Sequence, residues 1–113
     1  MSLPAEQISS NWEIFKGYIV KYIKEDRKDQ LLEFYNKHQN ELVMMPASHK
    51  KAYHNAFPGG YIDHVNRVIK CALELHNVWE KMGADTTTYT IEELVFAAIN
   101  HDLGKMGDGV EYA

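Results

Sequence analysis

The chain has a single cysteine, no long apolar run and no large excess of one charge. Cys71, the only cysteine among 113 residues, cannot form an internal disulfide, which excludes disulfide-rich secreted scaffolds and favours a reducing compartment. No segment approaches the roughly 20 apolar residues that cross a bilayer. The N-terminus also lacks the charged-then-apolar order of a signal peptide. These absences predict a cytoplasmic protein with no membrane partner.

The chain also lacks the overall positive charge that dominates nucleic-acid binding. Its formal net charge is −4, and the small positive patch of Lys50 and Lys51 beside His49 is interpreted as solvated surface. A nucleic-acid partner is therefore possible but not favoured. What the sequence does contain is 45% hydrophobic and 25% charged residues, as in a globular protein. The length suits one core, so we expect a single domain over residues 1–113.

Apolar residues recur at helical spacing in four segments, and none of the chain alternates as a strand would. The predicted helices cover residues 9 to about 23, a second segment that ends near 44, 61–82 and 91–102. Ser9 or Ser10 can cap the first helix, and Gly83 suits the end of the third. Thr90 and Glu93 form a capping box before the fourth. The sequence therefore predicts an all-α, compact bundle of about four to five helices, with its N-terminal helices over residues 9–44.

Residues 45–60 interrupt this periodicity and contain several turn-forming residues. They are Pro46, Ser48, Asn55, Pro58, Gly59 and Gly60. A loop of this length in a small domain usually has a function or is disordered. It carries His49 and His54. We interpret residues 46–108, which begin in this loop, as the region of a metal site.

The dipeptide His101-Asp102 closes the last predicted helix and puts two metal-binding side chains next to each other. A carboxylate is disfavoured at a helix C-terminus, where exposed carbonyls carry partial negative charge, and a bound cation would offset this cost. If helix 91–102 packs antiparallel to helix 61–82, its end lies near His64, at the edge of the apolar stripe. We therefore predict that His64, His101 and Asp102 converge. Two imidazoles and a carboxylate suit a divalent transition ion, with positions left for water and substrate.

The stretch from His101 to Lys105 reads His-Asp-Leu-Gly-Lys and resembles the signature of the HD-domain metal-dependent phosphohydrolases. The segment from His54 to His64, with a Gly-Gly pair inside it, is similar to the one that precedes the first ligand in many members. The resemblance covers about residues 46–108. It implies an all-α fold and hydrolysis of phosphate ester or anhydride bonds, most often in nucleotides.

The resemblance also implies roles for individual residues. His64 matches the first metal ligand, His101 and Asp102 match the signature pair, and His54 would lie near the metal and contact phosphate or a second ion. The expected cofactor is a divalent metal ion (Mn, Mg, Fe, Ni or Zn) that activates water near neutral pH. We expect Asp102, Lys105 and His54 to be catalytic, with the Lys105 ammonium steadying phosphate as a point charge. The expected partner is a small-molecule phosphate such as a nucleotide.

The end of the chain departs from the family pattern. The family's last aspartate comes well after the His-Asp pair, whereas this chain ends eleven residues past Asp102. Asp108 and Glu111 are too close in sequence to match it. We expect a truncated C-terminus; alternatively, the site is incomplete and water or another chain fills the position. Because a fragment would expose apolar surface, a homo-oligomer is also possible.

Two other functions fit the same residues. A 3′-end exonuclease would keep the chemistry and change the substrate, because segment 54–64 also resembles some exonuclease members of the family. The chain carries no basic stripe for a nucleic-acid strand, which counts against this function. A non-catalytic regulatory or interaction module would keep the helices and have an incomplete metal site. Loss of metal dependence would favour the module.

The remaining candidates have structural interpretations. His76 lies on the apolar stripe of helix 61–82 and is expected to be a core histidine with a hydrogen-bond partner. Asp63 is expected to stabilise the dipole of the same helix. His38 is interpreted as a surface residue. Three aromatic residues of the first helix are expected in the core rather than in a base-stacking platform: Trp12, Phe15 and Tyr18.

Overall fold

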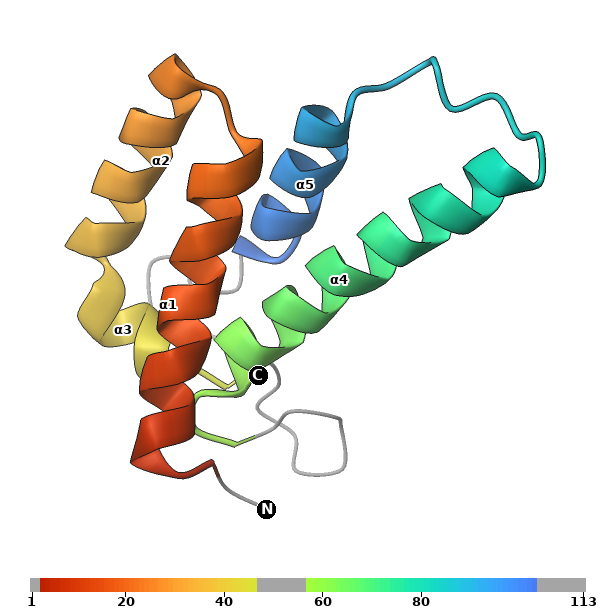
Figure 1. The fold of residues 1–113 in the computed structure, drawn as a ribbon. Coiled ribbons are helices and arrows are strands. Elements are labelled where there is room, and N and C mark those ends of the chain that lie inside the picture. Colours follow the sequence, from red (N-terminus) through yellow and green to blue (C-terminus); the bar gives the residue numbers. More distant parts are fainter. Residues whose placement is uncertain (1–2, 47–56, 104–113) are drawn as a thin grey trace.

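A computed structural model of the protein describes residues 3–46 and 57–103, and five helices make up most of this part (Figure 1). They are α1 (Ala5–Tyr22), α2 (Glu25–Lys37), α3 (Gln39–Met44), α4 (Gly60–Lys81) and α5 (Ile91–Asn100). The described residues contain no strand. The predicted all-α helical bundle is confirmed.

The first two predicted helices differ from the observed ones at their ends. The prediction that Ser9 or Ser10 caps the first helix is wrong, because α1 already begins at Ala5 with Pro4 as its N-cap. The carbonyl of Pro4 accepts hydrogen bonds from the backbone N–H groups of residues 7 and 8, which adds a turn. The second predicted helix is two helices, since the backbone of His38 (φ −104°, ψ 15°) ends α2 and starts α3.

The ends of α4 and α5 follow the sequence more closely. Gly83 has a φ of 86° just after the last residues of α4, as a left-handed helix end requires. The capping box is confirmed: Thr90 Oγ1 accepts from the Glu93 N–H at 3.0 Å, and Glu93 Oε1 accepts from the Thr90 N–H at 2.8 Å. The predicted end of the last helix at residue 102 is wrong, because α5 ends at Asn100.

One apolar core joins all five helices. Its fully buried members include one large side chain or more from each of them: Phe15, Ile19, Tyr35, Leu42, Ile62, Val65, Ile69, Val95 and Ile99. The Phe15 ring packs edge-on against the Tyr35 ring, with centroids 4.8 Å apart. The core prediction for Trp12 and Phe15 is confirmed, whereas Tyr18 is only partly buried.

Two sets of polar contacts fix the ends of α4 and α5 that face each other. At the start of α4, the N–H groups of Gly59 and Tyr61 donate to the carbonyls of Met44 and Met45, at 3.1 and 2.9 Å. At the end of α5, the Tyr35 hydroxyl donates to Asn100 Oδ1 at 2.7 Å. The first turn of α4 and the last turn of α5 are therefore both anchored to the α2–α3 side of the bundle.

The chain reverses direction between α4 and α5. Figure 1 shows α5 running back toward the start of α4, after a connection that leaves the far end of α4. Within the described ranges, no helix is long and apolar enough to cross a membrane. This arrangement brings the residues that follow α5 close to the first turns of α4.

Candidate metal centre

The first element of the candidate site is His64, in the second turn of α4. Ile62 and Val65 on either side of it are buried in the core, while the His64 side chain is 18% exposed. It therefore lies at the margin of the core, as its helical position predicts. Gly59, the N-cap of α4, packs closely against α1: a Cβ added to it would lie 2.8 Å from the Ile8 side chain. This contact holds the start of α4 in place.

The second element is His101, the residue that caps the end of α5. Its Nδ1 lies 2.7 Å from the carbonyl oxygen of Ala98. Because a carbonyl oxygen only accepts, Nδ1 must carry the hydrogen and donate it. A neutral His101 ring then has its lone pair on Nε2, the nitrogen that faces the rest of the site. A backbone acceptor of this kind is what commonly orients a metal-binding histidine.

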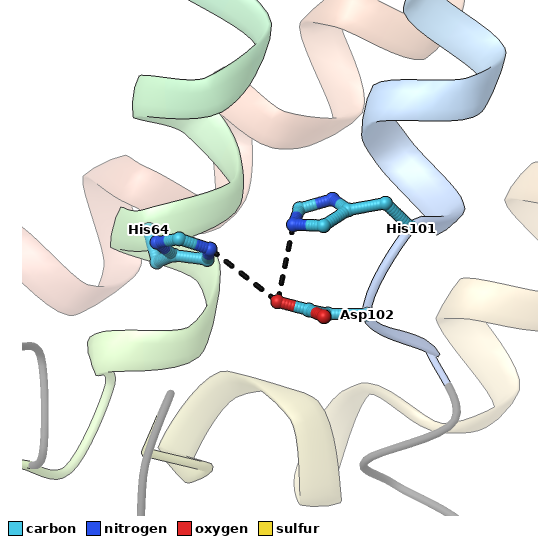
Figure 2. Close-up of side chains that lie close together, drawn as sticks. All are labelled: His64, His101 and Asp102. Carbon is cyan, nitrogen blue, oxygen red and sulfur yellow. Dashed lines mark ion pairs between the residues drawn. The ribbon is translucent and has the colours of Figure 1, made fainter.

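Asp102 joins these two histidines (Figure 2). Its Oδ2 lies 3.1 Å from Nε2 of His101 and 3.4 Å from Nε2 of His64. The two imidazole rings have centroids 5.5 Å apart. One ligand atom from each of the three residues lies within 4.8 Å of the others. The predicted convergence of His64, His101 and Asp102 is confirmed; their role as ligands stays a prediction.

The contact between His101 and Asp102 needs a positive charge to be favourable. With Nδ1 protonated, a neutral His101 presents a lone pair to a carboxylate oxygen 3.1 Å away, so two acceptors face each other. Such a contact is favourable only with a proton or a cation between the two atoms. The donor set therefore fits a positive charge at the point where the three side chains meet.

The two separations from Asp102 also fit a metal ion. Nitrogen and oxygen ligands lie about 2.1 Å from zinc, and two such ligands at angles of 90–109° are roughly 3.0–3.4 Å apart. The two separations from Asp102 Oδ2, 3.1 and 3.4 Å, fall in that interval. The side chains of His101 and Asp102 are 34% and 26% exposed, so the site opens to water on one side. Two imidazoles and one carboxylate can thus hold an ion with positions left over.

Other residues singled out from the sequence are not part of this cluster. Asp63 pairs with the Arg67 guanidinium at 3.2 Å and accepts from the Asn11 amide at 3.4 Å, in the first turn of α4. His76 is buried, and its Nδ1 is hydrogen-bonded to the Tyr89 hydroxyl at 2.8 Å. The prediction of a core histidine with a partner is therefore confirmed for His76.

Predictions for four further histidine and lysine residues have different outcomes. His38 is partly buried rather than fully on the surface, with its ring 3.5 Å from Glu41 Oε1 and against the Phe34 ring. His54 and Lys105, predicted to face the phosphate, lie outside the described residues. The same holds for His49.

The groups that hold the site in place were not predicted from the sequence. The Ala98 carbonyl orients His101, and Asn100 ties the end of α5 to Tyr35 while its amide donates to the Phe96 carbonyl at 2.9 Å. The Ala98 contact had a detectable signal, because a histidine three residues past a free carbonyl at a helix end can reach it. The contact between Tyr35 and Asn100 joins residues 65 positions apart and has no signal in the local sequence.

Comparisons with known proteins add no relative to this description. No match was found when the chain was compared with protein-family models, curated proteins and solved structures. The function is therefore inferred from the residues and geometry of the candidate metal centre.

Proposed function

We propose that the protein is a metal-dependent phosphohydrolase of the HD-domain type that acts on a nucleotide or a related phosphate ester. The observation that supports the proposal is the meeting of His64 and His101 on one oxygen of Asp102. These three side chains would hold a divalent ion. When bound there, the ion would lower the pKa of water and offset charge on phosphoryl oxygens.

The chain's own residues would prepare the site in two ways. The Ala98 carbonyl keeps the hydrogen of His101 on Nδ1, so that Nε2 is available as a ligand without a change of tautomer. The open side of the cluster, where His101 and Asp102 are about one-third and one-quarter exposed, admits water and a substrate. Orientation of this kind reduces the rearrangement that binding would otherwise require.

The proposed substrate class rests on the resemblance of the sequence motifs to the HD-domain family. We assign His54 and Lys105 to the phosphate side of the reaction, His54 near the ion and Lys105 as a point charge. A small nucleotide fits the chain better than a nucleic-acid strand, because the formal net charge is −4. The products would be inorganic phosphate, or pyrophosphate, and the dephosphorylated partner.

The test is release of phosphate or pyrophosphate from nucleoside mono-, di- and triphosphates with added Mn²⁺. Asp102→Ala removes the shared oxygen, and we expect it to abolish release. His38→Ala is the matched control, since His38 also contacts a carboxylate but sits on the turn between α2 and α3. Release that persists in Asp102→Ala, or that is equally lost in His38→Ala, would contradict the proposal.

A second candidate is a metal-binding module without catalysis. It is favoured by one observation: within the described residues the cluster contains three ligand groups and no fourth. Calorimetric Mn²⁺ binding that Asp102→Ala abolishes, together with no release of phosphate or pyrophosphate from any nucleotide in the panel, would support the module.

A further inference from the structure

The second half of α4 leaves one apolar face uncovered in the described structure. Leu75 and Val78 are about half exposed, Met82 at the C-cap is 79% exposed, and Cys71 is exposed on the same side. Figure 1 shows this part of α4 extending away from α1, α2 and α3. Burying such large apolar side chains in water-free contacts is favourable, so a contiguous face of this kind marks an interaction surface.

The four residues have the spacing of a coiled-coil contact line. Cys71, Leu75, Val78 and Met82 are separated by four, three and four positions, which is the pattern that packs one helix along another. We refer to these four residues as the α4 seam. The seam is not the core face of α4, which is formed by residues such as Val65 and Ile69. Within the described residues, no other helix covers it.

We propose that the α4 seam pairs with the α4 seam of a second copy of this chain, in an antiparallel two-fold dimer. In that register Leu75 lies against the partner's Val78, and Cys71 lies against the partner's Met82. Two-fold symmetry repeats each contact, so all four seam positions of both copies are covered. The proposal is independent of whether the metal centre hydrolyses a phosphate.

Charged residues beside the seam favour pairing with a second copy in the antiparallel orientation. Glu74 and Lys81 flank the same edge of the seam, seven residues apart, and neither has an ion pair within the part of the chain that the structure describes. The antiparallel register places Glu74 opposite the partner's Lys81, twice per dimer. Complementary flanking charges are what sets partner and orientation in helix pairs.

The other edge of the seam is complementary in size. The half-exposed Trp79 lies opposite the partner's Ala72, a small side chain that leaves room for the indole. A parallel pairing has neither advantage, because it places Glu74 opposite the partner's Trp79 and each Cys71 opposite the other. Both edges therefore favour the antiparallel register.

The interface is small. A contact of about three helical turns on each copy falls below about 1,200 Å² of total buried surface, the low end for specific complexes. We expect a dissociation constant in the micromolar range, and a mass by light scattering that rises from 13.0 kDa toward twice that value with concentration. A mass of 13.0 kDa at every concentration would overturn the proposal.

Charge variants test the partner and the register. Glu74→Lys places two lysines opposite each other, and we expect it to weaken the dimer about tenfold. The double variant E74K/K81E restores opposite charges and should restore the dimer. Val78→Asp, which changes a half-exposed side chain and leaves the core intact, should weaken it at least about 100-fold with unchanged helical circular dichroism. Failure of the double variant to recover would contradict the proposed antiparallel register.

The single native cysteine allows a second test. Met82→Cys places two thiols opposite each other in the antiparallel register, so a short bis-maleimide should link two chains in high yield. The wild type and the variant M82C/C71S keep one thiol each and should give little linked product. Efficient linking of the wild type would mean that the two Cys71 side chains meet, which contradicts the antiparallel register.

Discussion

At the residue scale, the carboxylate of Asp102 is the group on which the candidate site depends. One of its oxygens lies close to an imidazole nitrogen on each side, at 3.1 and 3.4 Å. The hydrogen bond from His101 to the Ala98 carbonyl determines which nitrogen of that ring faces the carboxylate. A negative oxygen against a nitrogen lone pair is repulsive unless a positive charge is shared between them. Asp63, next to His64 in the sequence, has a different role, because it forms an ion pair with Arg67 and accepts a hydrogen bond from Asn11.

We predict that Asp102→Asn removes metal binding and leaves the fold intact. The amide keeps the shape of the side chain, but it supplies no negative charge and can donate to a histidine lone pair instead. Loss of a group outside the ligand set costs 10–100-fold in metal affinity, so loss of this ligand should cost at least about 100-fold. Titration calorimetry with Mn²⁺ measures the change. The control is Glu41→Gln, which alters the carboxylate beside His38; equal losses in both variants would contradict a site at Asp102.

At the element scale, local signals predicted the helix ends that depend on local contacts. The capping box at Thr90 and the left-handed turn at Gly83 each depend on residues within four positions along the chain. The local sequence therefore contains the physical cause of each helix end. The start of α1 was predicted wrongly for the opposite reason. Ser9 can cap a helix, but contact between Ile8 and the Gly59 turn favours a longer α1 and is not visible locally.

We predict that Thr90→Ala destabilises the protein by about 1 kcal/mol, the usual cost of a lost N-cap. The hydroxyl accepts from the Glu93 N–H, and alanine would leave that donor to water alone. Urea unfolding followed by circular dichroism measures the free energy. Thr88→Ala, two residues earlier and exposed, should change it by less than about 0.5 kcal/mol. A similar loss in both variants would mean that the cap is not the cause.

We predict that Tyr35→Phe costs about 1–2 kcal/mol and changes the alkaline stability of the protein. The hydroxyl donates to Asn100 Oδ1 at the end of α5, and burial raises the pKa of Tyr35 above its usual value. The folded protein therefore keeps this proton while the unfolded chain loses it from about pH 10 upward. Stability from Tyr35 is full below pH 10 and falls as the pH rises beyond it. Urea unfolding from pH 8 to 11 should show a shallower loss in Tyr35→Phe than in the wild type, and parallel curves would contradict the assignment.

At the scale of the whole molecule, the meeting of His64 with His101-Asp102 could be predicted because it follows from helix lengths. From His64 to its end α4 rises about 26 Å, and α5 returns about 15 Å at 1.5 Å per residue. The connection between α4 and α5 covers the difference (Figure 1). The packing of α1 against α2 could not be predicted this way. Contacts such as that of Phe15 with Tyr35 join separate helices, and helical periodicity does not indicate which apolar residues pair across them.

The two halves of the candidate site therefore meet only in the folded chain, and a metal ion should stabilise the fold as a whole. Ligands that bind the folded state alone add about 2.7 kcal/mol at 100 times their dissociation constant. For a domain of this size that corresponds to a rise in melting temperature of about 10 °C. Differential scanning calorimetry with Mn²⁺ measures it. We expect the rise in the wild type and in His38→Ala, and none in His64→Ala, since α4 would then contribute no ligand to the ion. A rise that survives His64→Ala would mean that the ion binds to His101-Asp102 or elsewhere without joining α4 to α5.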